Sequence, residues 1–176
     1  GGLVTGALHE DGLADTLDGF GGGSDREAKL AIMRDSRCGT YGIIALIFSI
    51  GLRAAALVAI GSPIEAGLAL IAAHAASRAT LPAVMWRLAP ARADGLGALA
   101  GKPGLAPVLV AAAVGAFVAL GMLGPIRGLV ALVVTALAAA ATALLAKRQI
   151  GGYTGDVLGA IQQIGEIAML LVAAAK

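Results

Sequence analysis

The sequence contains few charged residues, few aromatic residues and a single cysteine. Of its 176 residues, 14% are charged and 3% are aromatic, whereas 59% are hydrophobic. Soluble domains carry about a quarter charged residues, so this composition excludes an ordinary soluble globular protein. Disorder is excluded because disordered chains are poor in apolar residues. Cys38 has no partner for an intrachain disulfide. The net charge of +2, with no basic cluster interleaved with aromatic residues, leads us to expect no nucleic-acid partner.

Long apolar segments are present instead, and they predict an all-α, polytopic integral membrane protein. Crossing a bilayer takes about 20 apolar residues in a helix. Five segments reach this length, at about 40–60, 64–86, 104–124, 128–146 and 157–175. Strands are a poor alternative, because alternation with a period of two is absent and an open sheet leaves backbone groups unsatisfied in lipid. We therefore expect five complete transmembrane helices in a single membrane domain over residues 1–176.

The start of the chain suggests an interrupted helix. The stretch from Gly1 to Leu8 is apolar but too short to span a bilayer, and the chain begins with glycine rather than methionine. We interpret this stretch as the end of a truncated N-terminal helix, so that the chain is a fragment lacking an N-terminal part.

The basic residues predict how the spans are oriented. The loops at 21–39, 87–103 and 147–155 together carry nine lysines and arginines, whereas the opposite side carries Arg127 and Lys176. Loops rich in lysine and arginine stay on the cytoplasmic side of a membrane. We expect a multi-pass protein of the cytoplasmic (inner) membrane, with these three loops facing the cytoplasm.

An acidic segment next to the first loop is the strongest indication of chemistry. Four acids, Glu10, Asp11, Asp15 and Asp18, lie within nine consecutive positions, and on a helix the three aspartates lie within about 60° of one another. Like charges at these spacings destabilise an isolated helix, and a divalent cation would offset them. Oxygen ligands favour Mg²⁺ or Mn²⁺ over zinc. We therefore interpret residues 9–39 as a cytoplasmic acidic motif and loop; a solvated acidic helix end is the alternative.

Other polar residues converge on the same side of the predicted membrane. Asp156 begins the last span level with the acidic segment, either as a helix N-cap or as a further ligand, and Gln163 lies on nearly the same face. Arg34 and Arg37 suit either phosphate oxygens or membrane anchoring. Arg78 lies inside the second span, about two turns from its cytoplasmic end, where a charged residue is costly without a partner. Metal ions and positively charged groups are what phosphoryl transfer requires.

The sequence resembles the cobalamin synthase family (adenosylcobinamide-GDP ribazoletransferases). The resemblance rests on His9 to Gly23, on Met33 to Arg37 followed by 39–42, on Ala76 to Arg78, and on Gly155-Asp156 with 158–160 and 162–163. It covers essentially the whole chain in order. It implies an Mg²⁺-dependent membrane enzyme in which a hydroxyl of α-ribazole, or of its 5′-phosphate, attacks the cobinamide-linked phosphate of adenosylcobinamide-GDP. GMP leaves, and adenosylcobalamin or its 5′-phosphate forms. Specificity for a corrinoid nucleotide follows from the resemblance alone.

Each candidate residue receives an expected role in this reaction. Asp11, Asp15, Asp18 and Asp156 are expected to hold the metal ion. Glu10 is the expected catalytic base, with His9 as the rival because its usual pKa suits the task better. The expected substrate-binding residues are His9, Arg34, Asp35, Ser36, Arg37, Arg78 and Gln163.

Two other functions remain open from the residues alone. A CDP-alcohol phosphotransferase also places aspartates at cytoplasmic helix ends, and Asp15 to Gly19 match the opening of its motif. Gly22 and Gly23, however, replace the Ala-Arg pair expected there. A cation transporter would need acids near the bilayer midplane and a path to both sides. The sequence leaves a homo-oligomer open.

Overall fold

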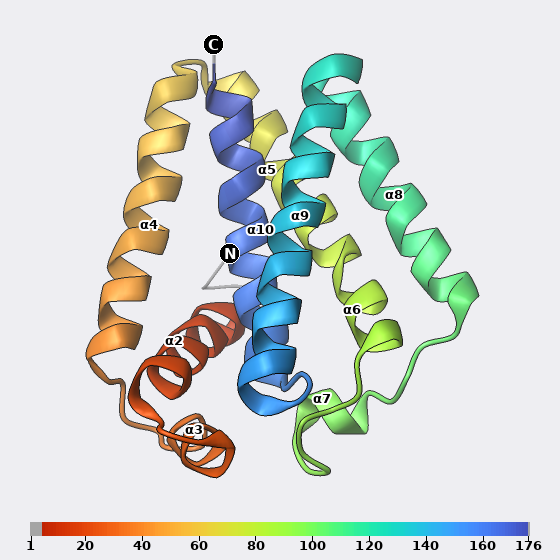
Figure 1. Cartoon of the computed structure of the whole chain (residues 1–176). Helices are drawn as coiled ribbons and strands as arrows, with labels where there is room; N and C mark the ends of the chain where they lie inside the picture. The colour runs from red at the N-terminus through yellow and green to blue at the C-terminus, as the bar shows by residue number, and fades with distance from the viewer. Residues whose placement is uncertain (1–4, 176) are drawn as a thin grey trace.

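The described part of the chain, residues 5–175, is almost entirely helical in a computed structural model (Figure 1). The helices are α2 (Leu8–Gly22), α3 (Arg26–Ile32), α4 (Thr40–Ile60), α5 (Pro63–Ala79), α6 (Leu81–Arg87), α7 (Leu96–Leu99), α8 (Leu105–Leu123), α9 (Pro125–Ile150) and α10 (Gly155–Ala174). Residues 5–175 contain no strand, only an isolated bridge between Pro90 and Tyr153. The all-α prediction is confirmed.

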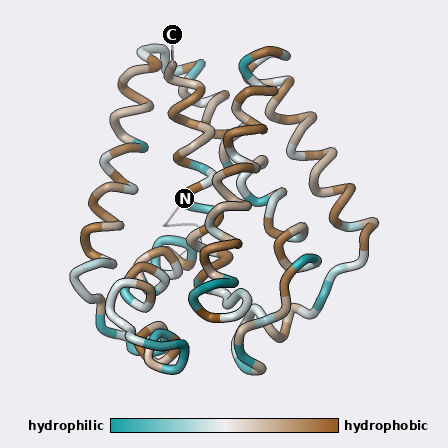
Figure 2. Tube along the Cα trace, viewed as in Figure 1, coloured by the Kyte–Doolittle hydropathy of each residue, from teal (hydrophilic) through white to brown (hydrophobic). Residues whose placement is uncertain are grey.

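Five helical segments are long and apolar enough to cross a membrane, as the sequence predicted. They are α4, α5 with α6, α8, α9 and α10. The second span consists of two helices that meet at Thr80, and Pro82 lies in the first turn of α6. Proline lacks the backbone N–H that a continuous helix needs, which accounts for the interruption. In Figure 2 the hydrophilic residues gather at the end that holds α3 and α7, whereas the spans are mostly hydrophobic.

The acidic segment forms a helix of its own, and this corrects one expectation from the sequence. Residues 1–4 of the expected truncated helix lie outside the described part of the chain. Gly6 and Ala7 both have left-handed backbone angles, with φ of 62° and 60°, and α2 begins immediately after them. The acids therefore lie within a separate helix rather than at the end of an apolar one. This helix lies between α4 and α10 at the loop end of the bundle (Figure 1).

Helix α10 is the centre of the fold. It contacts α2, α4, α5 and α9, and 61% of its most apolar segment is buried, compared with 17% for α8 and 11% for α4. Two buried clusters of small and aliphatic side chains surround it, one near the loop end and one near the opposite end. The polar residues of α10 consequently face protein rather than lipid.

The loops at the polar end are joined to one another. Backbone hydrogen bonds connect Ala91 N–H to Tyr153 O (2.7 Å) and Tyr153 N–H to Ala89 O (3.1 Å). Arg26 donates to Ile150 O at the end of α9 and to Ala91 O. These contacts fix the loop after α6 beside the start of α10, where the acidic helix also lies.

Candidate active site

Two glycines allow α2 and α10 to approach closely. A Cβ atom on Gly12 would lie 2.8 Å from the backbone oxygen of Asp156, and one on Gly159 would lie 3.2 Å from the Cα atom of His9. Only residues without a side chain permit helix backbones to come this near. The crossing places Asp11 and Asp15 of α2 beside Asp156 in the first turn of α10. We call Asp11, Asp15 and Asp156 the acidic cluster.

The acidic cluster carries more negative charge than its surroundings neutralise. Burial, followed by the charges of Asp11, Asp156 and Asp18, raises the pKa of the Asp15 carboxyl to about 7. Thr154 caps the start of α10, accepting from Val157 N–H, and its hydroxyl donates to Asp156. Asp156 is therefore not the N-cap itself; its carboxylate accepts from Thr154 and Arg92, and its charge acts on Asp15.

Arg92 is the cation of this site, and sequence reasoning counted it only among the orienting charges of its loop. Its Nη2 atom donates to Asp156 Oδ2 at 3.2 Å. Its Nη1 atom is buried and, within the described residues, has no hydrogen-bond partner. An unpaired buried N–H of a charged group is costly, so Arg92 has one donor available for a ligand. An arginine in a loop gives no sequence signal that separates this role from membrane anchoring.

Asp18 has a structural role that the metal-ligand prediction did not foresee. Its two carboxylate oxygens accept the backbone N–H groups of Gly39 (2.7 Å) and Gly42 (2.8 Å) at the start of α4. A Cβ atom on either glycine would collide with this carboxylate. Asp18 thus caps α4 from a neighbouring helix, and both of its oxygens are occupied.

The carboxylates of the acidic cluster provide some of the ligands that a hard divalent cation requires. Within residues 5–175 no group of three or more histidine, cysteine, aspartate or glutamate side chains is placed so that it could hold a metal ion. Mg²⁺, however, usually binds only one or two carboxylates and takes its other ligands from water and substrate phosphates. Asp11 and Asp15 offer two carboxylates one helical turn apart, and burial, followed by the charges of neighbouring aspartates, raises the pKa of Asp15. Asp11, Asp15 and Asp156 are accordingly the residues that would hold Mg²⁺, and metal binding at the cluster stays a prediction.

Glu10 and His9 face away from the aspartates. Glu10 Oε1 lies 3.5 Å from Arg53 Nη1, and Glu10 Oε2 is buried without a hydrogen-bond partner in the described part of the chain. Burial and the positive charge of Arg78 lower the pKa of the His9 imidazole. The free oxygen of Glu10 is available to accept a proton, while His9 lies among the polar groups of the spans.

Those polar groups form a network at membrane depth that we call the buried polar network. Its centre is Glu166 on α10, which is 3.2 Å from Arg53 Nη1 and 3.1 Å from His74 Nδ1, and which accepts Gln162 Nε2 at 2.6 Å. Gln162 also donates to Ser77 at 3.2 Å. Arg53 lies within the span α4, and its guanidinium has two carboxylate partners, Glu10 and Glu166.

Two expected substrate-binding residues belong to this network or its edge. Gln163 is buried, donates to Gln162 Oε1 and accepts from Ser49. Arg78 Nη1 contacts His74 Nδ1 and donates to His74 O, one turn earlier on α5. Both side chains are held by protein groups at the level of the spans rather than at the acidic cluster.

The basic loop between α3 and α4 is exposed, and its charges are paired within the protein. Arg34 donates to both carboxylate oxygens of Asp94 at 2.7 Å. Hydrogen bonds from Arg37 lower the pKa of the Asp35 carboxyl to about 2, while Ser36 is exposed. Asp35 and Arg37 line part of a hollow of about 440 Å³ that also borders Asp18. These residues lie on the acidic-cluster side of the protein.

Comparisons with known proteins show which family the chain resembles. The family model described as "Cobalamin-5-phosphate synthase" matches residues 1–174. A protein named adenosylcobinamide-GDP ribazoletransferase from Bradyrhizobium diazoefficiens is 60% identical over 98% of this chain and 66% of its own length. Proteins of the same name from Azorhizobium caulinodans and Mesorhizobium japonicum are 52% and 51% identical, over 96% and 97% of this chain.

The chain spans 66% of the length of these relatives. No solved structure matches it. The family match over nearly the whole chain, and the identity of half or more to three curated relatives, lead to one conclusion. The chain belongs to the cobalamin-5-phosphate synthase family.

Proposed function

We propose that the protein to which this chain belongs joins α-ribazole, or its 5′-phosphate, to adenosylcobinamide-GDP in an Mg²⁺-dependent reaction that releases GMP. The family assignment and the name shared by the relatives support this over a CDP-alcohol phosphotransferase or a cation transporter. The loop distribution supports an active site on the cytoplasmic side of the inner membrane.

One observation carries the proposal: α2 and α10 bring Asp11, Asp15 and Asp156 together beside Arg92. These carboxylates would hold Mg²⁺, which when bound supplies positive charge to the phosphates of the substrate. Arg92 offers its unpaired Nη1 donor to a phosphate oxygen. Phosphoryl transfer depends mainly on positioning and on neutralising charge, and this site has the groups for both.

The reaction forms one phosphorus–oxygen bond and breaks another. A hydroxyl oxygen of the acceptor attacks the phosphate attached to cobinamide, and the bond from that phosphate to GMP breaks. The hydroxyl proton must go to a base within hydrogen-bond reach. Glu10 stays the predicted base, since its Oε2 atom has no hydrogen-bond partner among the described residues, although its carboxylate lies toward Arg53 rather than toward the acidic cluster. Asp18 supports the site indirectly by fixing the start of α4 against α2.

The test is product formation by the full-length protein reconstituted in liposomes. The reaction contains adenosylcobinamide-GDP, α-ribazole and Mg²⁺, and GMP and adenosylcobalamin are measured. We expect Asp15→Asn to lower the rate by about 10²–10³-fold, the loss typical of removing one group that stabilises developing charge. Arg92→Gln is expected to lower it by a similar factor if its free donor holds a phosphate.

Glu27→Gln is the matched control, because Glu27 is an exposed carboxylate outside the cluster. It is expected to leave the rate unchanged. Full activity of Asp15→Asn would remove the acidic cluster from the mechanism. Release of CMP from a CDP-alcohol, with no product from the corrinoid nucleotide, would replace the proposed reaction with the phosphotransferase alternative.

A further inference from the structure

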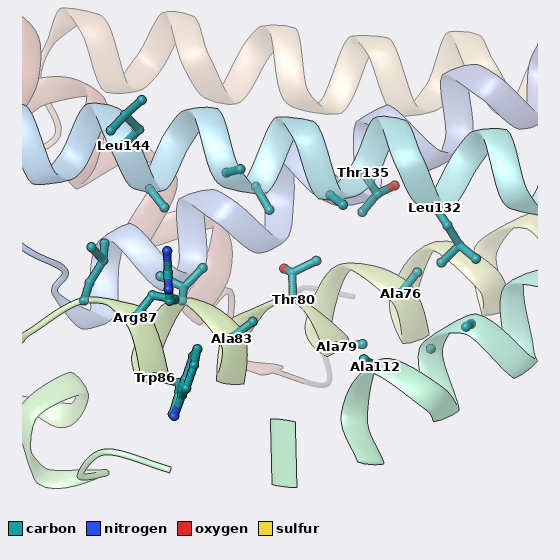
Figure 3. Close-up of a pocket in the computed structure, with 18 of the residues that line it drawn as sticks. Ala76, Ala79, Thr80, Ala83, Trp86, Arg87, Ala112, Leu132, Thr135 and Leu144 are labelled. Carbon is teal, nitrogen blue, oxygen red and sulfur yellow. The ribbon is translucent and has the colours of Figure 1, made fainter. Parts of the chain in front are cut away.

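A large cavity lies on the other side of the bundle from α2. It has a volume of about 1010 Å³ and lies between α5 with α6, α8 and α9. Most of its lining is alanine and other apolar side chains, including Ala79, Ala112 and Ala140. We call it the α8–α9 pocket. Figure 3 shows Trp86 and Arg87 toward one end of it and Ala76 and Leu132 toward the other.

Three cations mark one end of the α8–α9 pocket. Arg87, Lys102 and Lys147 all line it and are all exposed, and within residues 5–175 none of them has an acidic partner. Lys147 lies in the last turn of α9, and Arg87 ends α6, so the cations lie at the end of the bundle that carries the basic loops. Along α9 the pocket extends from Lys147 to Leu132, about 22 Å at 1.5 Å per residue.

The α8–α9 pocket is separate from the acidic cluster. Val84, Ala139 and Ala143 line it and belong to the same buried cluster as Val157 and Ile161 of α10. The acidic cluster lies where α2 crosses the start of α10, beyond this apolar layer. A ligand in the pocket therefore does not reach Asp15 or Asp156, and the proposed reaction leaves the pocket unused.

We propose that the α8–α9 pocket binds an anionic phospholipid, with an acyl chain along the apolar lining and the headgroup phosphate at Arg87, Lys102 and Lys147. The apolar length exceeds the roughly 15 Å of one leaflet's hydrocarbon layer, so a whole acyl chain fits. The cations lie at the end where an anionic headgroup would be. Basic residues near an anionic membrane surface each contribute attraction to such lipids.

Charge complementarity selects this occupant over others. An apolar helix or a zwitterionic lipid would fill the apolar lining but leave three unpaired cations without a counter-ion. A soluble phosphate would pair with the cations but leave the apolar cavity unfilled. An anionic phospholipid satisfies both ends at once.

Trp86 gives a direct measurement, because it is the only tryptophan of the chain and it lines the pocket. The full-length protein is reconstituted in vesicles of unlabelled phosphatidylcholine that contain a small fraction of brominated phosphatidylglycerol or of brominated phosphatidylcholine. Bromine quenches tryptophan fluorescence on contact. Provided the full-length protein carries no other tryptophan, or any other is first replaced by phenylalanine, the signal reports the lipid next to Trp86.

Two matched pairs of variants separate the pocket from the general surface charge. Lys147→Gln removes a pocket cation, whereas Arg148→Gln removes the exposed cation next to it, which does not line the pocket. Ala140→Phe fills the pocket, whereas Ala141→Phe adds the same ring on an exposed position of α9 outside it.

We expect brominated phosphatidylglycerol to quench Trp86 more than the same fraction of brominated phosphatidylcholine. Lys147→Gln should reduce the preference for phosphatidylglycerol over phosphatidylcholine by about fivefold, the factor for one basic residue at an anionic surface. Ala140→Phe should abolish the preference. Arg148→Gln and Ala141→Phe should leave it within twofold of the unmodified protein. Equal quenching by the two lipids, no quenching by either, or equal effects within a matched pair would overturn the proposal.

Discussion

The acidic cluster and the buried polar network both consist of charged groups around α10, but their charges are balanced differently. In the network, Glu166 has Arg53, His74 and Gln162 within 3.2 Å, and its side chain is only 3% exposed. In the cluster, Arg92 donates to Asp156, while burial and the neighbouring aspartates raise the pKa of Asp15 to about 7. A balanced group stabilises the fold, whereas an unbalanced one is available for a ligand.

The largest effect on folding is expected from the network. Among the residues that the structure describes, Glu166→Gln leaves Arg53 with only the more distant Glu10 as a carboxylate partner. Removing one partner of a buried ion pair costs about 3–5 kcal/mol, and we expect a loss near the lower end because Glu10 remains. Reversible unfolding in mixed detergent micelles measures it. Glu65→Gln, at an exposed position, is the control; equal stability of the two variants would show that the network contributes nothing.

Substitution of Asp18, which belongs to neither the acidic cluster nor the buried polar network, is expected to cause a smaller loss of folding stability. Asp18→Ala removes the acceptor of two backbone N–H groups at the start of α4. Loss of a helix cap costs about 1–2 kcal/mol, and the same unfolding experiment measures it. If Asp18 acts only as a cap, the activity of each folded molecule should fall far less than in Asp15→Asn. A loss of activity as large as that of Asp15→Asn would make Asp18 a metal ligand after all.

Substitution in the acidic cluster should stabilise the folded protein, whereas substitution of Glu166 or Asp18 should destabilise it. The pKa of Asp15 lies above its usual value of 3.8 in the folded protein. Protonation of Asp15 therefore stabilises the fold, fully below about pH 4, and this contribution is lost as pH rises through about 7. Without divalent cations, Asp15→Asn should be more stable than the unmodified protein at pH 8, and the difference should shrink toward pH 5. A constant difference between these pH values contradicts the electrostatic explanation.

The smallest effect on folding stability is expected from breaking the ion pair of Arg34 and Asp94, whose side chains are 55% and 67% exposed. Exposed pairs contribute about 0–1 kcal/mol, so Arg34→Gln should hardly change the unfolding midpoint. If Arg34 exchanges Asp94 for a substrate phosphate, the KM of the variant should rise while kcat stays the same. An unchanged KM would show that Arg34 pairs with Asp94 and does not bind the substrate.

The sequence predicted the spans well because their signal is local. Hydrophobic length gave α4 at its observed limits, and the other spans within a few residues. The separate start of α2 was missed because Gly6 and Ala7 interrupt an apolar stretch without a distinctive turn motif. The glycines that allow α2 to cross α10 also carry no pattern of their own.

The site was predicted in part, because partners far apart in sequence decide the role of each side chain. Helix periodicity and membrane side predicted that Asp11, Asp15 and Asp156 lie near one another, and Asp11 and Asp156 do act electrostatically on Asp15. Their role as metal ligands stays a prediction. Gln163 was assigned to substrate although the structure buries it against Gln162 and Ser49. Arg53 and Glu166 are 113 residues apart, and neither the hydropathy pattern nor the helical period pairs them.

We propose that the acidic cluster binds a divalent cation because its negative charge is only partly neutralised, and one titration tests this directly. The unfolding midpoint of the unmodified protein and of Asp15→Asn is measured at pH 8 against increasing Mg²⁺. We predict that Mg²⁺ raises the midpoint of the unmodified protein, since a ligand that binds the folded state stabilises it. Asp15→Asn should begin with a higher midpoint and respond little to Mg²⁺. A lower initial midpoint for Asp15→Asn, together with an equal response to Mg²⁺, would contradict the account.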